Sequence, residues 1–548
     1  MGGVGWAVRK KSTMAGLAVC SSQRVCGISI RVLALIVSYA CCLSCSTDVT
    51  VDDGLHAVPS RTASWFRDPH MPNTDVGTIG QNSLEYGGVS DGTDDDLSPY
   101  APVSAPARIP GRQAVQRINQ IADPPSSIYV SPQADPLRAT GSVDQPYASI
   151  NVALEDAQPG DNIVLLEGTY REGVSVRIRT PNITIKSAYG QWAVIDLTHP
   201  DPQAIEDSGI YFDVDSTGSR LQGLEVIGGY YAVSIETRWD WGDPDNRAGA
   251  SNIIVEDSIL HHSQYDVVKI KPGCDNIIIR NNVIHASGQA FSGNPRTGED
   301  NAEGIDIVNA DNVLIQGNYI YDIVSNGIYA KGGSTNTTIE FNLIENVSAG
   351  GILVGFDTSP EYFDLEANPH FYENMFAVVR ENLVIGSGWE GIGFYAAAGA
   401  HVSHNTLINV TQGGMFHSGI YFGLSYQDWE PYAGRPPSKD ISFHNNIVSQ
   451  SPDSSGLPMI EIRYSDELGG LSALQSMPNM EGNCYSQPDG QVTFTDMRPS
   501  SLLNMASFRA WQAHSGTDST SVEESLVFDQ GYQTSNPSCS GISWSLTN

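Results

Sequence analysis

The sequence predicts an all-β chain folded as a right-handed parallel β-helix, a solenoid whose N-terminal end is capped by a short helix. Three observations predict this fold. Segments of alternating apolar residues repeat about every 24 residues, an asparagine recurs at one point of the repeat, and an amphipathic helix pattern precedes the first copies. Three short strands per coil fit this period, and stacked coils form parallel sheets with strands about 4.8 Å apart.

The recurring asparagine follows a run of alternating apolar residues, as in NIIIRNNVIHAS. Its successive spacings are 36, 24, 40, 23 and 41 residues, so we take 24 as the unit and infer insertions of about 12, 16 and 17 residues in the longer gaps. At a turn, each side chain can bond to the backbone and to the asparagine of the neighbouring coil, which predicts a ladder. The ladder positions are Asn282, Asn318, Asn342, Asn382, Asn405 and Asn446.

A second strand of six residues precedes the asparagine segments. Its third and fifth letters are almost always apolar and are expected to point inward, so the second, fourth and sixth letters point outward. Most second letters are glycine, which predicts a shallow floor between the outward columns. The copies are SGIYFD (208–213), YAVSIE (231–236), DVVKIK (266–271), EGIDIV (303–308), NGIYAK (326–331), GGILVG (350–355), EGIGFY (390–395) and SGIYFG (418–423).

The start of the solenoid has a helix pattern of its own. Its apolar residues have helical spacing, and Pro159-Gly160 ends the pattern, so a short helix is expected to cover the open end of the coil. The spaced residues are Tyr147, Ile150, Ala153, Leu154 and Ala157. We therefore assign residues 126–480 to the β-helix and 481–548 to a C-terminal capping segment.

Residues 1–44 are expected to be a signal peptide. Basic residues precede the apolar run VLALIVSYACCLS, which is too short to cross a bilayer. The following LSCSTD resembles a lipoprotein signal with Cys45 as the lipidated residue; ordinary cleavage and full secretion is the alternative. Residues 45–125 are polar and rich in Pro, Ser and Gly, which predicts a disordered tether.

The amino-acid composition limits the classes of molecule that the protein can bind. Asp and Glu outnumber Lys and Arg by 62 to 29, giving a formal charge of −33. A chain this acidic repels nucleic acid and anionic membranes, so we expect no nucleic-acid partner and contact with a membrane only through a lipid anchor. Beyond the leader, Cys484 and Cys539 could form a disulfide near the C-terminus while Cys274 stays single, and their spacing does not suit zinc.

The opening YVSP…QPYASINVALEDAQPGDNIVLLEGTY and the asparagine turns resemble the pectate-lyase-like superfamily of right-handed β-helix proteins. The resemblance covers residues 127 to 545. It implies a secreted, carbohydrate-active protein, since the superfamily contains polysaccharide lyases, glycoside hydrolases, uronate epimerases and many members of unknown role. Neither the paired-aspartate calcium motif nor the Lys/Arg motif of the well-described lyases is visible in this chain.

Charged outward residues gather on a few neighbouring coils, and four long insertions border the same column. Eliminative cleavage of a uronate polymer needs a base and a cation that neutralises the carboxylate, and lysine can act as the base. The candidate catalytic residues are Lys269, Lys271 and Lys331. Candidate calcium ligands are Asp213, Glu236 and Asp306, and candidate sugar-binding aromatics are Tyr211, Tyr329, Trp239, Trp241, Tyr395 and Tyr421.

The function these residues favour is an exported, monomeric lyase that cleaves an acidic polysaccharide by β-elimination. Glycoside hydrolysis competes with it, since carboxyls are available, but no adjacent aspartate pair is present. Epimerisation on the same fold and non-catalytic glycan binding by a surface lipoprotein are also compatible with these residues. Cross-strand ion pairing on a solvated face would account for any single charged pair.

Overall fold

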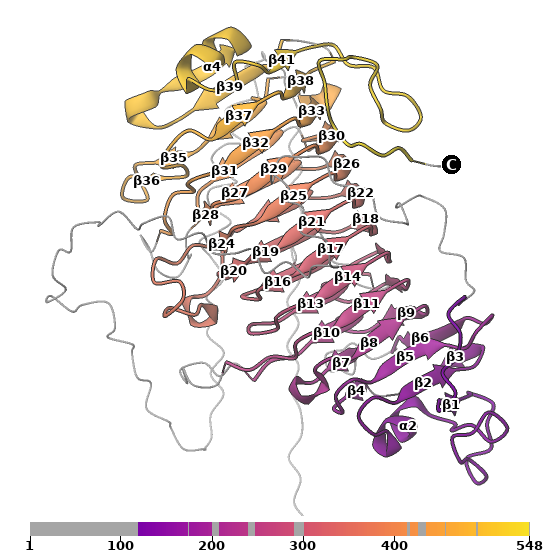
Figure 1. Ribbon diagram of the computed structural model, residues 1–548. Coiled ribbons are helices and arrows are strands. Elements are labelled where there is room, and N and C mark those ends of the chain that lie inside the picture. Colours follow the sequence, from indigo (N-terminus) through magenta and orange to yellow (C-terminus); the bar gives the residue numbers. More distant parts are fainter. Residues whose placement is uncertain are drawn as a thin grey trace, which may run out of the picture. The chain divides into compact units, whose positions relative to one another are not determined.

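The computed structural model describes residues 119–173, 175–199, 208–238, 247–289, 301–413, 417–425, 434–454, 456–488 and 491–546. These residues belong to one compact unit. They wind into a stack of coils that forms a parallel β-helix, as predicted (Figure 1). The predicted signal peptide, Cys45, most of the tether, Trp239 and Trp241 lie outside the described residues.

Three sheets of twelve strands each run along the stack. Sheet 1 contains β1 (Ile128–Val130), β2 (Asn162–Leu165), β5 (Thr184–Ser187), β8 (Arg220–Gln222), β11 (Ile254–Glu256), β14 (Ile278–Arg280), β17 (Leu314–Gln316), β21 (Thr338–Glu340), β25 (Val378–Arg380), β29 (His401–Ser403), β32 (Ser442–His444) and β37 (Asn479–Glu481). Sheet 2 contains β4 (Val176–Ile178), β7 (Ile210–Phe212), β10 (Val233–Ile235), β13 (Val268–Ile270), β16 (Ile305–Val308), β19 (Ile328–Lys331), β23 (Ile352–Val354), β27 (Ile392–Tyr395), β31 (Ile420–Gly423), β34 (Ile460–Ile462), β39 (Thr493–Asp496) and β40 (Leu503–Ser507). Sheet 3 contains β3 (Gly168–Tyr170), β6 (Ala193–Leu197), β9 (Glu225–Gly228), β12 (Ile259–His261), β15 (Val283–His285), β18 (Tyr319–Ile323), β22 (Leu343–Val347), β26 (Leu383–Ser387), β30 (Thr406–Val410), β33 (Ile447–Gln450), β38 (Cys484–Ser486) and β41 (Val522–Glu523).

The six-residue copies form the central strands of sheet 2, in the predicted register. Third and fifth letters such as Val268 and Ile270 are fully buried in one continuous core, and Lys269 between them pairs in register with Asp306 of β16. The predicted inward face is therefore correct, whereas the second letters Ala232 and Val267, which were expected to point outward, are buried in the same core. Burying these apolar rows is the main source of the free energy of folding in such a coil.

The asparagine ladder is confirmed. Each Nδ2 donates to the Oδ1 of the next asparagine, over 2.9 to 3.2 Å, from Asn282 to Asn446 and on to Asn483. Each Oδ1 also accepts the backbone N–H of the preceding asparagine, as Asn382 Oδ1 does from Asn342. The ladder thereby satisfies buried polar groups at a turn between sheets 1 and 3.

Both ends of the coil are covered. Helix α2 (Ile150–Asp156) packs on β1, β2 and β4 and buries Ile150 and Ala153, as predicted for the cap (Figure 1). At the other end β40 and helix α4 (Phe508–Ser515) follow, while β38 and β41 continue sheet 3 beyond the boundary expected at residue 480. No helix of the described ranges is long and apolar enough to span a membrane.

The C-terminal segment is fastened to the coil by a disulfide between Cys484 and Cys539, the pairing that the sequence allows. Cys274 is a free, buried thiol in the core. After the disulfide, the chain runs back along sheet 3, where Ile542 and Trp544 pack on Leu383 and Ile408. The indole of Trp544 donates to the carbonyl of Glu381 at 2.8 Å.

Candidate active site on sheet 2

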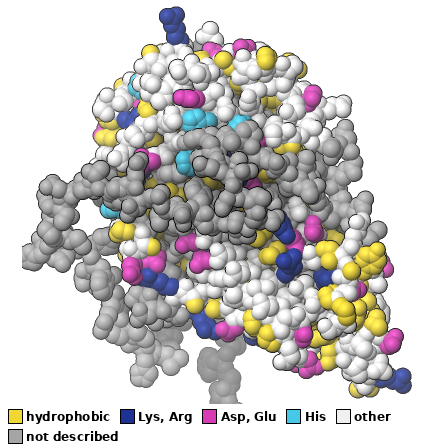
Figure 2. Space-filling model, viewed as in Figure 1, with side chains coloured by type: hydrophobic (Ala, Val, Ile, Leu, Met, Phe, Trp, Pro, Cys, Tyr) yellow, Lys and Arg dark blue, Asp and Glu magenta, His cyan; other side chains and the backbone are white. Residues whose placement is uncertain are grey.

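Three lysines gather on the outer side of sheet 2. The sequence contains seven lysines. Lys269 lies on β13, Lys271 directly follows β13, and Lys331 ends β19, which is separated from β13 by β16. Three of the seven lysines therefore lie within three consecutive coils, which would not be expected by chance. On the face shown in Figure 2, basic side chains lie among acidic ones, and no patch of a single sign forms.

The centre of this group is Asp306, whose side chain is fully buried. Its Oδ2 pairs with Nζ of Lys269 and lies 3.6 Å from Nζ of Lys331. Lys269 Nζ also lies 3.2 Å from Oδ2 of Asp266, three residues earlier on the same coil. Burial alone would lower the pKa of Lys269, but the carboxylates of Asp306 and Asp266 raise it well above its ordinary value. Lys269 is therefore a fixed cation at neutral pH, which corrects its assignment as a general base.

Glu303 forms a buried carboxyl cluster with Asp266 and Asp306. The sequence indicated Glu303 only as a carboxyl available for hydrolysis and did not indicate Asp266, whereas Asp306 was a candidate calcium ligand. Burial and the neighbouring charge of Asp266 raise the pKa of Glu303 well above its usual range. Burial would raise the pKa of Asp266 as well. The charge of Lys269 and the hydrogen bonds from the side chain and the backbone N–H of Glu303 outweigh this effect, so the pKa of Asp266 is lowered overall. The two opposite shifts make Glu303 the more basic carboxyl of the pair. Both residues are the first letters of their six-residue copies, and that polar first-letter column was the available signal.

Lys271 forms a separate pair at the edge of the cluster. Its Nζ lies 2.8 Å from Oε2 of Glu236, whose other oxygen accepts a hydrogen bond from Ser234. The side chain of Lys271 is 28% exposed, against 13% for Lys269 and 12% for Lys331. It is therefore the lysine of this group best placed to touch a polymer lying on the sheet.

Half-buried tyrosines lie beside these lysines. The ring of Tyr231 is 5.9 Å from Nζ of both Lys269 and Lys271, and the rings of Tyr230 and Tyr265 lie 4.4 Å apart next to it. Aromatic faces next to cations suit the binding of sugar rings. We call Tyr230, Tyr231, Tyr265 and the three lysines the lysine centre.

The structure does not assemble the predicted calcium ligands. Asp213 is held by Arg177 at 2.8 Å and Arg179 at 3.0 Å, and Glu236 is held by Lys271. Asp213 follows β7, which lies three strands from the β16 of Asp306, so about 14 Å separates their backbones. One ion cannot bridge that distance, because calcium takes its oxygen ligands at about 2.3–2.6 Å.

A different carboxylate set does converge: single oxygens of Asp266, Glu303 and Asp306 lie within 4.8 Å of one another. This set fits a calcium ion poorly. The ammonium groups of Lys269 and Lys331 already pair with Asp306, and the raised pKa of Glu303 disfavours its ionised form. Two ammonium groups at this distance also repel a divalent cation.

Several predicted sugar-binding tyrosines are buried, which corrects their assignment. Tyr329 and Tyr395 are 3% and 2% exposed, because Phe356 from the segment after β23 packs edge-on against both rings. The guanidinium of Arg177 covers Tyr211 at 4.2 Å. Tyr421 is only partly buried and stays available. The glycine floor is also absent, since a Cβ on Gly304 or Gly327 would lie within 2.6 Å of the carbonyl of the next coil.

A histidine–carboxylate pair lies farther along the same face. His417 Nδ1 is 2.6 Å from Oε2 of the fully buried Glu390, whose Oε1 accepts a hydrogen bond from Tyr395. Burial would raise the pKa of Glu390, but the imidazole of His417 lowers it below its usual value. The His417 ring stacks on Trp389 at 4.8 Å. No sequence motif indicated this pair, because the contact joins residues 27 positions apart.

Residues 207–368, which include all the catalytic candidates, match the family model described as a right handed β-helix region. The match agrees with the coils and registers described above. The described residues therefore form a right-handed parallel β-helix. No curated protein matches it.

Solved structures of other β-helix proteins resemble this one at low identity. The A-module of mannuronan C-5 epimerase AlgE4 from Azotobacter vinelandii is 12% identical, with a TM-score of 0.44 over 64% of this chain and 85% of that one. Pectate lyase Pel9A is 15% identical, with a TM-score of 0.36 over 70% and 78%. PfbA, a surface adhesin of Streptococcus pneumoniae, is 13% identical, with a TM-score of 0.41 over 63% and 83%.

Proposed function

We propose that this β-helix protein is a carbohydrate-active enzyme that cleaves an acidic polysaccharide by β-elimination at the lysine centre. One observation carries the proposal: three of seven lysines in a strongly acidic chain converge on one face beside half-buried tyrosines. A uronate polymer supplies the negative charge that such a group would recognise. The epimerase and the pectate lyase named above act on polymers of this kind by their printed names.

In this proposal the lysines have different roles. Lys269 and Lys331 supply positive charge to the uronate carboxylate, so that the proton on the adjacent ring carbon becomes more acidic. Lys271 removes that proton in its neutral amine form, after its ammonium group has released a proton to the solvent. The C–H bond breaks, a double bond forms in the ring, and the bond to the leaving glycosidic oxygen breaks as that oxygen takes up a proton from water.

Glycoside hydrolysis is the second candidate, because the raised pKa of Glu303 beside the lowered pKa of Asp266 is the pattern of a general acid next to an ionised carboxyl. Its geometry argues against this role. The oxygens of Asp266 and Glu303 lie within 4.8 Å, and retaining and inverting hydrolases need carboxyl separations of about 5–5.5 Å and 6.5–9.5 Å. Glu303 is also only 2% exposed.

Export and lipid attachment at Cys45 stay predictions of the sequence. The disulfide between Cys484 and Cys539 supports export, because such bonds persist in oxidising compartments.

The proposal is tested by incubating the full chain with a panel of uronate and neutral polysaccharides, with and without chelator. A lyase produces the ultraviolet absorbance of an unsaturated uronate, and we expect chelator to leave it unchanged, because lysines supply the charge. New reducing ends without this absorbance would indicate a hydrolase, and changed uronate stereochemistry without cleavage an epimerase. Retention of polymer with none of these would indicate a binding protein.

A further inference from the structure

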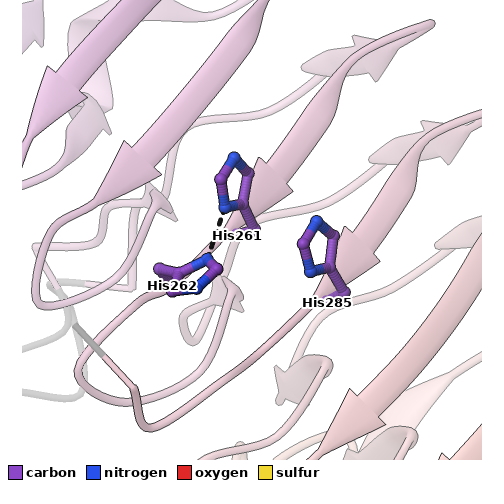
Figure 3. A group of neighbouring side chains, drawn as sticks. All are labelled: His261, His262 and His285. Carbon is purple, nitrogen blue, oxygen red and sulfur yellow. Dashed lines mark hydrogen bonds between the residues drawn. The ribbon is translucent and has the colours of Figure 1, made fainter. Parts of the chain in front are cut away.

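Three histidines meet on sheet 3, on a different sheet from the lysine centre. His261 ends β12, His262 follows it in the turn, and His285 ends β15 one coil later (Figure 3). His261 and His285 are register partners, and their rings lie parallel with centroids 4.6 Å apart. One ring nitrogen from each histidine lies within 4.8 Å of the other two. Three imidazoles on two adjacent strands can therefore face one small ligand.

A buried carboxylate orients the first of these rings. His261 Nε2 lies 3.1 Å from Oε1 of Glu225 on the neighbouring strand β9, and the indole N–H of Trp192 donates to the other oxygen at 3.2 Å. The carboxylate favours the tautomer of His261 that carries its proton on Nε2. The lone pair is then on Nδ1, which faces the other histidines. Imidazoles that bind metals are commonly held by a carboxylate in this way.

The contact between His261 and His262 shows where an ion would bind. Nδ1 of His261 and Nδ1 of His262 are 2.5 Å apart (Figure 3). Two lone pairs cannot face each other at that distance, so one hydrogen lies between them, and a cation can take the place of that hydrogen. Tetrahedral zinc with bonds of about 2.0–2.1 Å needs its nitrogens about 3.4 Å apart. The two rings would have to separate by about 0.9 Å, and His262 lies in a turn.

We propose that His261, His262 and His285 bind one divalent transition-metal ion of the zinc class, with Glu225 as the residue that positions His261. Three neutral imidazoles favour Zn²⁺, Cu²⁺ or Ni²⁺ over calcium and magnesium, which prefer oxygen. The ion would link β12 to β15 and so stabilise adjacent coils. This site is independent of the proposed lyase activity, because its residues lie on sheet 3.

A purely structural role is the competing explanation. His285 also stacks on Tyr321 at 4.6 Å, and Tyr321 stacks on Tyr319 at 4.5 Å, so the histidines extend an aromatic row along sheet 3. His285→Phe separates the two explanations, because phenylalanine keeps the stacking and removes the nitrogen. His262→Gln is a second variant whose folding does not depend on that row.

The test is calorimetric titration of the full, tag-free chain with zinc chloride after treatment with chelator. We expect one equivalent bound by the wild type, and affinity at least about 100-fold weaker in His285→Phe and His262→Gln. Glu225→Gln should weaken binding by about 10–100-fold. His370→Phe, which replaces an exposed histidine elsewhere, should bind as the wild type does.

Thermal melts give the second readout. Zinc at 100 times its dissociation constant should raise the wild-type melting temperature and leave that of His285→Phe unchanged, while the zinc-free melts of the two proteins coincide. Equal zinc affinity in wild type, His285→Phe and His262→Gln would overturn the proposal, and so would the absence of binding at millimolar zinc.

Discussion

Lys269 and Asp306 are register partners on adjacent strands of sheet 2, and their side chains form an ion pair with the carboxylate fully buried and the lysine nearly so. The pair is thus part of the packing of the coil as well as part of the lysine centre. The contributions of this pair to stability and to catalysis can be separated experimentally, because unfolding experiments measure the first and cleavage rates measure the second.

Lys269→Met should destabilise the protein by about 3–5 kcal/mol, because it leaves the buried carboxylates of Asp306 and Asp266 without their closest cation. Denaturant unfolding followed by circular dichroism measures the change. The double variant Lys269→Met/Asp306→Asn should recover part of the loss, since it removes one unpaired charge. A single variant less than about 1 kcal/mol below the wild type would contradict the buried pair.

Lys271→Ala should lower the rate of cleavage by about 100-fold or more on whichever polymer is cleaved, because it removes the general base. The melting temperature should change little, because a partly exposed lysine contributes little to the stability of the fold. Initial rates of ultraviolet absorbance measure it. Lys439→Ala, a lysine outside the centre, is the matched control and should be fully active. Equal rates for Lys271→Ala and wild type would assign the base to another residue.

The stability of the wild type should fall as the pH rises above about 4.5, the ordinary value for glutamate, through the raised folded pKa of Glu303. Both states are neutral at this position below the ordinary pKa, whereas above it the unfolded chain ionises first and is favoured. Glu303→Gln should flatten this slope. Melting temperatures of both proteins between pH 4 and 8 provide the comparison, and parallel curves would show that Glu303 ionises normally.

Asn382→Ala should destabilise the coil by several kcal/mol, at about 1–3 kcal/mol for each buried group left without a partner. Its amide donates to Asn405 and to the carbonyl of Ile339, and its oxygen accepts from the backbone N–H and the side chain of Asn342. Asn479→Ala, an exposed strand asparagine, is the control and should change stability by less than about 0.5 kcal/mol. A loss for Asn382→Ala no larger than for the control would remove the energetic role of the ladder.

Cys45→Ala should release the protein from membranes if Cys45 is lipidated. Expressed in a Gram-negative host, the wild type should partition into detergent and the variant into the aqueous phase. Cys42→Ala provides the control, because it lies in the apolar run and should leave anchoring unchanged. A wild type that is already aqueous would favour secretion.

The coil could be predicted in detail because its determinants are local and repeated. Alternating residues such as Val268 and Ile270 determine the inward face, and the asparagine period determines the turns. The ionic partners were harder to predict. Arg177 and Arg179, which hold Asp213, lie on or directly after β4, a strand that did not stand out as a copy of the repeat.

The site was also hard to predict because long segments between strands bury some of the residues expected to bind sugar. Tyr329 and Tyr395 occupy outward positions, and only the fold of the segment after β23, which brings Phe356 onto them, shows that they are covered. The raised pKa of Glu303 depends on burial and on the charges of a three-residue cluster, and no spacing along the sequence indicates either. Residue periodicity thus predicts the scaffold, whereas the chemistry of the site depends on contacts between distant segments.

The asparagine ladder also bears on how such a protein can diversify. Successive rungs are separated by 36, 24, 40, 23, 41 and 37 residues, yet their side-chain hydrogen bonds differ by at most 0.3 Å in length. Insertions of more than a dozen residues are therefore accommodated without a mismatch between neighbouring coils. Segments facing the solvent can be lengthened, shortened or exchanged between relatives while the backbone beneath them stays in place, so new specificities can evolve without a new fold.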